Sequence, residues 1–391
     1  MSSHLLNGDH RHVSGSNRRK PRVVIGRSLA YGFNVPQSHL PDFEFVVQPQ
    51  LPLWRVSLAL GGFCIPILPL KKINLLHTFN AIPGIGVPHV ITFESILPRT
   101  LGRWGNAVSD RTRSLLLRNS CRAMIAFSHY AVKRCLERHR NWADTPKLLA
   151  KISVVYPSLD APENDDVLIE KAKDRIDVVF VGFHFARKGG ISCLRAAKMA
   201  QQNNLPVHFH IISGLEYGGG IYTDCADRAR YEKDLALLDL PNVSFHRALP
   251  NRDVLALMRK SHILALPTVH DTFGYSVLEG YASGAAAIGT SVSALPELIE
   301  DEKSGWLLGA PIDGVGSWLH LNRLTPENSW RLLDEYYQSA ADQMYARLEM
   351  LVEDRDKLQA AQQGGLDLLR RRFSRPVAAE QIGAIYERAI G

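Results

Sequence analysis

Cysteine is scarce and scattered in this chain of 391 residues. Its five cysteines include no Cys-x-x-Cys pair, and their number is odd. This pattern excludes a disulfide framework and a zinc finger, and it favours a reducing, cytoplasmic compartment. Long apolar segments are also missing, because the longest uncharged apolar run, residues 56–70, has only 15 residues and is interrupted by glycine and proline. A membrane-spanning helix needs about 20 apolar residues, so we expect no segment to cross a membrane.

Acidic residues are scarce in the first part of the chain. Residues 1–150 contain 20 Lys and Arg against 7 Asp and Glu, a net charge of +13, whereas the remainder carries −6. A basic half of this kind favours a partner that carries phosphate. Nine basic residues lie within residues 101–140, with Trp104 and Leu115–Leu117 between them, and a basic amphipathic stretch of this kind is typical of an anionic membrane surface as partner. The alternative is a soluble enzyme with a basic cleft for a charged substrate, and nucleic acid is not expected because no binding motif accompanies the charge.

Short apolar segments alternate with helical patterns along the chain, which favours an α/β fold with mainly parallel sheets. A first series starts at residues 22–26, and a second restarts at residues 178–182 after a polar, acidic stretch. Further strands are predicted at residues 43–47, 73–76, 89–92, 124–127, 152–156, 208–213, 243–246, 263–266 and 285–289, and helices at 131–138 and 190–203. The length suits two domains. We expect a mobile basic tail at 1–20, an N-terminal domain at 21–165, a C-terminal domain at 170–374 and a last helix at about 375–391.

The clearest chemical pattern lies within residues 263–309. A buried strand, Ile263–Leu266, ends in a polar loop, and a short helix begins near Gly274. Ligands of open α/β sheets bind at the carboxyl ends of strands, where this loop lies. A helix that begins there would direct the backbone N–H groups of Gly274, Tyr275 and Ser276 toward the loop, and with the helix dipole they would favour an anion such as a diphosphate.

Two carboxylates, Asp271 and Glu279, flank this anion site. In these positions they can accept hydrogen bonds from sugar hydroxyls. The whole segment resembles the signature of the retaining nucleotide-sugar glycosyltransferases of family four, which have the GT-B fold. The residues that carry the resemblance are Leu266-Pro267-Thr268, Asp271-Thr272-Phe273-Gly274, Glu279, Gly284, Pro296-Glu297 and Ser304-Gly305.

Two segments upstream are similar to other parts of the same family's donor domain. Residues 180–182 (Phe-Val-Gly) followed by 187–189 (Arg-Lys-Gly) are similar to its first strand and turn, and residues 242–249 are similar to the strand and turn that face the nucleobase. The resemblance implies that Lys188 contacts the donor diphosphate. A lysine opposite a helix N-terminus would close a clamp on a pyrophosphate.

The resemblance implies an α/β protein of the GT-B type, with two Rossmann-like domains that face each other across an interdomain cleft. The N-terminal domain, completed by the last helix, would bind the acceptor, and the C-terminal domain would bind the donor. The implied enzyme moves a sugar from a nucleotide-sugar donor to a hydroxyl of a glycan or lipid-linked acceptor with retention of configuration. It would act in cell-surface polysaccharide or lipopolysaccharide-type biosynthesis, in the cytoplasm or peripherally on the cytoplasmic face of the inner membrane. No cofactor and no metal are expected, because Lys188 and the helix amides can stabilise the leaving diphosphate.

The resemblance also implies roles for single residues. With Lys188, the catalytic candidates are Asp271, which would hold the transferred sugar, and Glu94. Glu94 has two interpretations: it orients the acceptor hydroxyl or stabilises an oxocarbenium-like centre, or it is an ion-pair residue at a strand end. Glu279 would bind the ribose hydroxyls. The other residues expected at the donor are Gly182, Arg187, Arg247, Leu249, Phe273, Gly274, Tyr275 and Ser276.

Three positions depart from the family pattern. Asp271 is one methylene shorter than the usual glutamate, Phe183 stands where relatives often carry arginine, and Glu94 stands where many have histidine. These departures leave open a non-catalytic nucleotide-sugar-binding protein. A GT-B nucleotide-sugar epimerase is a second alternative, because it would share the anion site. The motifs do not distinguish UDP, GDP and ADP donors. A nicotinamide-dependent dehydrogenase is not expected, because no Gly-x-Gly-x-x-Gly turn follows either first strand.

Overall fold

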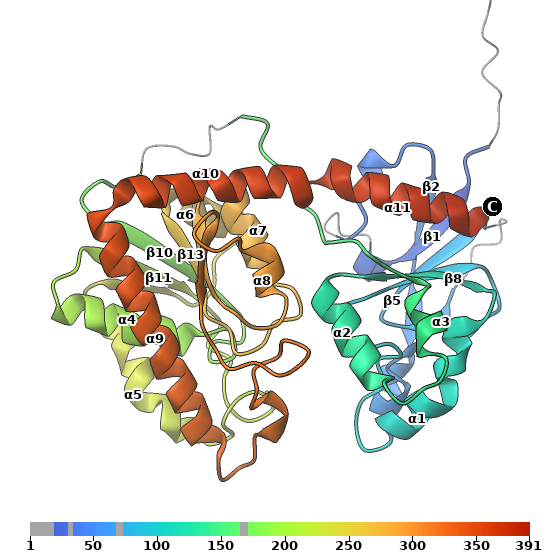
Figure 1. Ribbon diagram of the computed structural model, residues 1–391, viewed down its shortest axis with the longest axis horizontal. Helices are drawn as coiled ribbons and strands as arrows, with labels where there is room; N and C mark the ends of the chain where they lie inside the picture. Colours follow the sequence, from blue (N-terminus) through green and yellow to red (C-terminus); the bar gives the residue numbers. More distant parts are fainter. Residues whose placement is uncertain (1–18, 30–33, 68–72, 165–170) are drawn as a thin grey trace, which may run out of the picture.

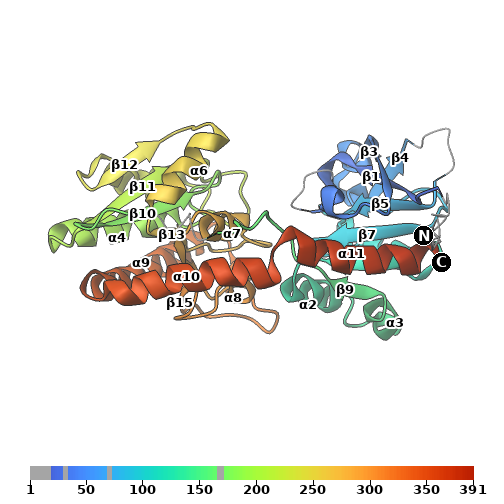
Figure 2. The same cartoon turned by 90° about the horizontal axis from the view of Figure 1, so that it is seen from above.

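The computed structural model of the chain describes residues 19–29, 34–67, 73–164 and 171–391. Within these ranges the chain forms two lobes that lie side by side, each built on its own six-stranded sheet (Figure 1). Helices α10 (Arg355–Arg372) and α11 (Arg375–Ile390) run end to end across the two lobes, α10 on the C-terminal lobe and α11 on the N-terminal lobe (Figures 1 and 2). Most of the tail predicted at 1–20 lies outside the described residues.

The N-terminal lobe contains a parallel sheet with the spatial order β2-β1-β5-β7-β8-β9. Its strands are β1 (Arg22–Gly26), β2 (Glu44–Gln48), β5 (Leu75–Phe79), β7 (His89–Phe93), β8 (Cys121–Ala126) and β9 (Ile152–Val154). Its helices are α1 (Gly105–Thr112), α2 (His129–Arg138) and α3 (Thr145–Leu149). The interior of β1 is continuously apolar because both faces of the sheet are covered, and its Val23, Val24 and Ile25 are all buried. From β1 the chain moves to β2 at the edge and then returns to β5 on the other side of β1.

A second, three-stranded sheet in the N-terminal lobe was not predicted from the sequence. It consists of β3 (Gln50–Pro52), β4 (Phe63–Pro66) and β6 (Ile82–Pro83), in the order β3-β4-β6. Single 3-10 turns at Leu53–Arg55 and Leu58–Leu60 connect β3 to β4. These strands are short and rich in proline, and sequence periodicity does not detect strands of this kind.

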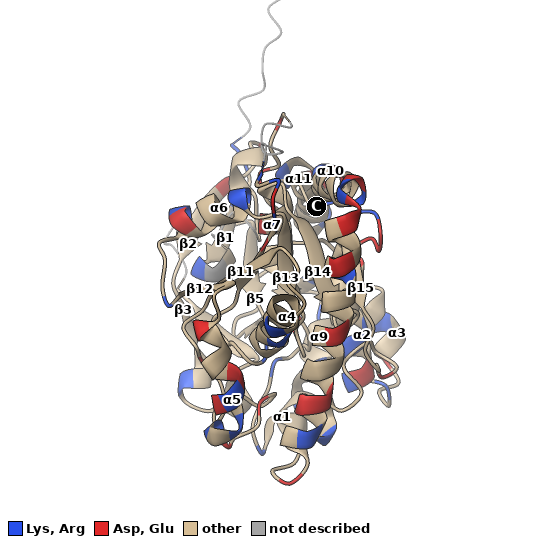
Figure 3. Cartoon of the chain, turned by 90° about the vertical axis from the view of Figure 1, so that its left-hand side faces the viewer, with Lys and Arg blue, Asp and Glu red and all other residues tan. Residues whose placement is uncertain are grey.

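The C-terminal lobe contains a parallel sheet with the order β12-β11-β10-β13-β14-β15. Its strands are β10 (Ile176–Val181), β11 (Val207–Ile212), β12 (Val243–His246), β13 (Ile263–Leu266), β14 (Ala286–Thr290) and β15 (Gly305–Leu308). Its helices are α4 (Gly190–Gln202), α5 (Glu232–Leu235), α6 (Asn251–Lys260), α7 (Tyr275–Ala282), α8 (Leu295–Leu298) and α9 (Ser329–Glu353). Helix α9 carries both acidic and basic residues (Figure 3), and its Arg331 and Glu335 form an i,i+4 ion pair of 2.9 Å.

The last helix, α11, packs on the N-terminal sheet. Its Ala378, Ile382 and Tyr386 belong to the same buried cluster as Val23 of β1 and Leu75 of β5. The contact also includes a polar link that is wholly buried. His77 Nδ1 lies 2.7 Å from the Tyr386 hydroxyl, and His77 Nε2 lies 2.7 Å from the Thr92 hydroxyl.

Most predicted strands agree with the structure within one to three residues, and the strand predicted at 73–76 is shifted and begins at Leu75. The predicted strand at 152–156 ends at Val154, shortly before Pro157, which has no N–H group for a ladder. Among the described residues, no helix is both long and apolar enough to cross a membrane.

Candidate functional site

The carboxyl ends of β10 and β13 meet where the C-terminal sheet changes direction. The chain runs from β10 outward through β11 and β12, and then returns to place β13 on the other side of β10. The loops that follow two such strands diverge, which leaves room for a ligand at this edge of the sheet. The loop after β10 carries Lys188, and the loop after β13 carries Asp271.

Lys188 and Asp271 form an ion pair at this point, although 83 positions separate them in the chain. The Asp271 side chain is almost completely buried. Burial alone would raise the pKa of its carboxyl, but the Lys188 ammonium outweighs burial and holds that pKa below its usual range. The Asp271 carboxyl is therefore charged at neutral pH. The two loops are also tied together, because Thr268 Oγ1 and Val269 N donate to the carbonyl oxygen of Arg187, each at 2.9 Å.

Helix α7 begins directly after the Asp271 loop. Gly274 precedes it with φ +102°, and a Cβ at this position would lie 2.8 Å from a Leu295 methyl carbon. Only glycine fits this turn, so α7 has no side-chain cap. The buried Phe273 donates its backbone N–H to Asp271 Oδ1 at 3.4 Å. The first turn of α7, which includes Ser276, thus presents uncapped amides and the positive end of the helix dipole beside Lys188.

Two arginines from different lobes add positive charge to this region. Arg187 lies next to Lys188, and Arg134 lies on α2 of the other lobe; the Nε atom of each is buried and has no hydrogen-bond partner among the described residues. Burial lowers the pKa of His270 to about 4; Asp271 opposes this, and the charges of Arg134, Arg187 and Lys188 reinforce it. Three cations therefore lie within electrostatic range of one neutral imidazole. Unpartnered arginine N–H groups of this kind favour an anion as ligand.

The two lobes touch at this same region. The Tyr275 hydroxyl donates to Asn34 Oδ1 of the N-terminal lobe at 2.9 Å. A residue of the N-terminal lobe also reaches the C-terminal lobe: the Tyr130 hydroxyl of α2 lies 2.9 Å from Ser317 Oγ and 3.5 Å from His270 Nδ1. The start of α7 and the loop after β13 therefore lie at the boundary between the lobes.

Glu94 follows β7 in the N-terminal lobe and faces this boundary. Its carboxylate accepts hydrogen bonds from Arg99 Nη1 at 2.5 Å and from Asn80 Nδ2 at 3.3 Å. Burial, and then the negative charges of Glu94 and Asp271, raise the pKa of the Tyr275 phenol. Glu94 and Asp271 thus lie within electrostatic range of one side chain. Glu94 is ion-paired after the end of a strand and also faces the other lobe, and the choice between its two interpretations remains a prediction.

The remaining predicted residues differ in how close they come to this centre. Glu279 lies one turn into α7, and its carboxylate has no hydrogen bond or ion pair among the described residues; burial raises its pKa. Gly182 ends β10, where a Cβ would lie 2.9 Å from Lys188 Cβ. Arg247 and Leu249 follow β12, the edge strand two positions from β10. Arg247 is exposed and Leu249 packs against the core, so these two lie at the margin of the site.

No group of three or more His, Cys, Asp or Glu side chains within the described ranges is arranged to hold a metal ion. The absence of a metal requirement remains a prediction.

Comparison with known proteins agrees with this geometry. Residues 163–315 match the model of the family described as glycosyl transferases group 1. The chain carries a glycosyltransferase group 1 domain. The matched range includes Lys188, Asp271, α7 and Glu279, so the ion pair, the helix N-terminus and the unpaired carboxylate all lie within this domain.

Three proteins are similar to this chain over most of its length. An uncharacterised 41.2 kDa protein of the cps region of Klebsiella pneumoniae is 27% identical over 294 residues, which cover 73% of this chain and 68% of that protein. A solved glycosyltransferase of Rickettsia africae has a TM-score of 0.62 and 12% identity, and the match covers 95% of this chain and 99% of that one. HepE of Anabaena, solved with UDP and glucose, has a TM-score of 0.55 and 12% identity over 93% and 98% of the two chains. The expected GT-B fold is thereby confirmed.

Sequence patterns did not single out several residues that the structure places at this candidate site. Arg134 was counted among the basic residues of 101–140, but it lies within electrostatic range of His270 at the lobe boundary. Tyr130 and Asn34 reach the same boundary from the N-terminal lobe. No local motif marks these positions, because their neighbours in space come from the other half of the chain.

Proposed function

We propose that this protein is a retaining glycosyltransferase of family four that uses a nucleotide-sugar donor and no metal. It transfers the sugar to a hydroxyl of a glycan or lipid-linked acceptor in the synthesis of a cell-surface polysaccharide or a lipopolysaccharide-type glycan. The observation that carries this proposal is the Lys188–Asp271 pair, which lies beside the uncapped N-terminus of α7 and the orphaned Nε of Arg187. That arrangement suits a diphosphate joined to a sugar.

The comparisons support the same donor chemistry. HepE, which has the same fold, was solved with UDP and glucose. The relative of Klebsiella pneumoniae is described by its place in the cps region, which supports a polysaccharide product. The exposed ring of Phe183 lies against Gly214 at the carboxyl end of β11, where a Cβ on Gly214 would be 3.3 Å from it. In the proposed complex this ring provides a stacking surface for the nucleobase.

The reaction breaks the bond between the anomeric carbon and the diphosphate oxygen, and it forms a bond from the same carbon to the acceptor oxygen on the same face of the sugar. The acceptor proton passes to the departing diphosphate. Lys188 and the first amides of α7 stabilise the negative charge that develops on that leaving group. Asp271 holds hydroxyls of the transferred sugar, and Glu279 accepts hydrogen bonds from the ribose. When the diphosphate is bound, it competes with Asp271 for the Lys188 ammonium.

Glu94 acts from the acceptor side. With Arg99 and Asn80 fixing its carboxylate, it orients the acceptor hydroxyl toward the anomeric carbon. The enzyme works in the cytoplasm, and basic residues of 101–140 hold it on the cytoplasmic face of an anionic membrane. Within that range Arg113 and Arg138 are paired with Asp110, so exposed residues such as Arg111 provide the membrane contact.

Calorimetric titration of UDP, GDP and ADP into the wild type and into Glu279→Ala tests the donor site. We expect one nucleotide to bind in the micromolar range and the substitution to weaken it at least tenfold. Glu380→Ala, which changes an exposed glutamate of α11, is the matched control and should bind as the wild type does.

Incubation with the labelled donor of that nucleotide then separates three activities. Transfer to an acceptor supports the proposal, free isomerised sugar indicates an epimerase, and unchanged donor indicates a binding protein. If none of the three nucleotides binds the wild type, the donor assignment fails.

A further inference from the structure

A cavity of about 610 Å³ lies in the N-terminal lobe, apart from the Lys188–Asp271 pair. It lies at the point where the N-terminal sheet changes direction, because its lining includes Gly26 and Arg27 at the end of β1 and residues 79–81 at the end of β5 and just after it. Each of the two sheets thus has a candidate site at the equivalent position, which is where the order of its strands reverses. The volume of the cavity is in the range of small-molecule sites, about 300–1,000 Å³.

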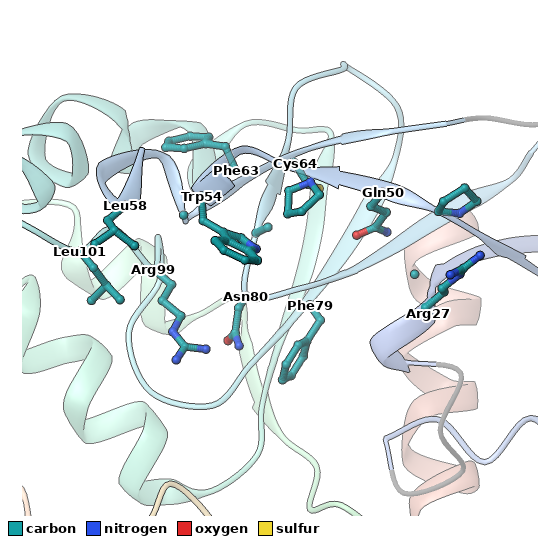
Figure 4. Close-up of a pocket in the computed structure, with 15 residues that line it drawn as sticks. Arg27, Gln50, Trp54, Leu58, Phe63, Cys64, Phe79, Asn80, Arg99 and Leu101 are labelled. Carbon is teal, nitrogen blue, oxygen red and sulfur yellow. The ribbon is translucent and has the colours of Figure 1, made fainter. Parts of the chain in front are cut away.

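One wall of this cavity is polar and consists of residues at the carboxyl edge of the sheet. Asn80 and Arg99 line it and also hold the Glu94 carboxylate, so the polar wall leads to the lobe boundary. Arg27 lies at the end of the cavity farthest from Leu58 and Leu101 (Figure 4). It is exposed and forms no ion pair among the described residues.

The polar wall also holds an orphaned donor. The Nε2 atom of Gln50 is buried and has no hydrogen-bond partner within the described ranges. Gly26 leaves the space that this side chain occupies, since a Cβ there would lie 2.8 Å from Gln50 Cδ. No Asp or Glu is among the described residues that line the cavity. Cationic and amide donors without a carboxylate suit a phosphate better than the hydroxyls of a free glycan.

The opposite wall is apolar and comes from the three-stranded sheet and its 3-10 turns. Trp54, Leu58, Phe63 and Leu101 line it (Figure 4). Leu101 N donates to the carbonyl oxygen of Leu58 at 3.0 Å, which joins the two segments into one surface. An apolar wall opposite phosphate-binding donors matches a ligand that is itself half apolar.

Trp54 and Leu58 of the apolar wall are also exposed on the surface, and so is Trp104, three positions after Leu101. Trp54 is 52% exposed, Leu58 57% and Trp104 65%. The guanidinium of Arg55 lies 5.7 Å from the Trp54 ring, and that of Arg103 lies 5.5 Å from the Trp104 ring. Soluble proteins rarely expose clustered large apolar side chains without a partner, and Trp with Arg is typical of contact with lipid at the membrane interface.

We propose that this cavity binds the acceptor and that the acceptor is a lipid that carries a phosphate. The apolar chain lies against Trp54, Leu58 and Leu101. The phosphate is bound by Arg27 and the free amide of Gln50, and the hydroxyl to be glycosylated points to Glu94. This assignment rests on the proposed transferase function, because it names the acceptor class of that reaction.

Calorimetry with farnesyl phosphate, kept below its micelle concentration, tests the assignment on the full chain. Farnesol, which has the chain without the phosphate, and glucose 1-phosphate, which has a phosphate and a sugar without the chain, are the comparison probes. We expect farnesyl phosphate to bind the wild type at least tenfold more tightly than either. Leu58→Glu should weaken farnesyl phosphate at least tenfold. Arg27→Gln should weaken farnesyl phosphate at least tenfold and leave farnesol binding unchanged.

Ile312→Glu is the matched control, since Ile312 is equally exposed but lies in the C-terminal lobe; it should bind all probes as the wild type does. Thermal unfolding and nucleotide titration of every variant report on its fold and its donor site. The assignment is overturned if farnesyl phosphate binds Leu58→Glu and Arg27→Gln as tightly as it binds the wild type, or if it binds the wild type no more tightly than glucose 1-phosphate does. Either result overturns it even where a nucleotide binds. If farnesyl phosphate binds as expected and no nucleotide does, the proposed transferase function fails and the lipid phosphate site remains.

Discussion

The Glu297 carboxylate of the C-terminal lobe accepts the backbone N–H of Tyr130 in the N-terminal lobe at 2.7 Å, across 167 positions of the chain. Its other oxygen accepts the N–H of His129 at 2.8 Å and the Tyr156 hydroxyl at 2.9 Å. The first amides of α2 are therefore capped by a carboxylate from the opposite lobe. Arg372 completes the group by donating to the Tyr156 oxygen at 2.5 Å. This contact sets how the two lobes meet beside the proposed site.

Replacing Glu297 by Gln should loosen the contact between the lobes. Hydrogen bonds to a charged acceptor contribute about 1.5–3 kcal/mol each, so we expect the free energy of unfolding to fall by about 2 kcal/mol. The radius of gyration in solution scattering should increase, because the lobes separate more freely. Glu335→Gln, which removes only the exposed pair with Arg331, is the control. Equal effects of the two variants on stability and on the radius would contradict the role given to Glu297.

Replacing Lys188 by Met should affect stability and donor binding through different partners. The substitution leaves the buried Asp271 carboxylate unpaired, which costs about 3 kcal/mol in the free energy of unfolding. Adding Asp271→Asn removes the uncompensated charge, so the double variant should recover most of that stability. Neither variant regains the ammonium, and we expect both to bind the nucleoside diphosphate about tenfold to a hundredfold more weakly.

The parent nucleoside provides the internal control for that experiment. Its affinity should be the same in the wild type and both variants, because it carries no phosphate for Lys188 to contact. Lys198→Met, on an exposed position of α4, should change neither measurement. Diphosphate binding that recovers along with stability in the double variant would show that Lys188 has only a structural role.

Arg134→Gln and Arg111→Gln separate the two functions proposed for basic residues of 101–140. Arg134 lies within electrostatic range of His270 at the lobe boundary, so its loss should weaken nucleoside diphosphate binding about threefold to tenfold and reduce the dependence of that binding on salt. Arg111 is exposed on α1, so its loss should weaken sedimentation with anionic vesicles and leave nucleotide binding unchanged. Identical behaviour of the two variants in both assays would contradict this division.

The buried His77 should make the protein less stable in weak acid. Burial lowers its pKa from 6.5 to about 3, and its neighbours are the Tyr386 and Thr92 hydroxyls, which carry no charge. As the pH falls below 6.5, the imidazole is protonated in the unfolded chain and remains neutral in the folded protein. Stability is therefore full above that pH and is lost progressively as the pH falls toward 3.

Chemical denaturation at pH 7.5 and pH 5 measures this loss. His77→Gln keeps two hydrogen-bonding atoms and does not titrate. From pH 7.5 to pH 5, its free energy of unfolding should therefore fall by about 2 kcal/mol less than that of the wild type. His39→Gln, an exposed position, should follow the wild type. If the free energies of unfolding of the wild type and His77→Gln differ by the same amount at both pH values, the explanation is refuted.

Much of the fold could be predicted because its signals are local. The strands of the C-terminal lobe are short apolar segments, and the turn before α7 requires Gly274 in the left-handed region. The three-stranded sheet could not be predicted, since β3, β4 and β6 have few residues and pair between segments far apart in the sequence. The predicted domain boundaries and the roles of the site residues remain predictions.

The sequence by itself determined the alternation of strands and helices, the glycine turn, and the residue types that a diphosphate needs, because each depends on neighbours along the chain. Only the tertiary structure decided which charges meet. It paired Lys188 with Asp271 where the strand order of the C-terminal sheet reverses, and it brought Arg134 of the N-terminal lobe to the boundary between the lobes. It also formed the cavity lined by Arg27 where the strand order of the N-terminal sheet reverses. The physical reason is that electrostatic and packing energies depend on distance in space, and parallel strands bring together loops that are far apart in sequence.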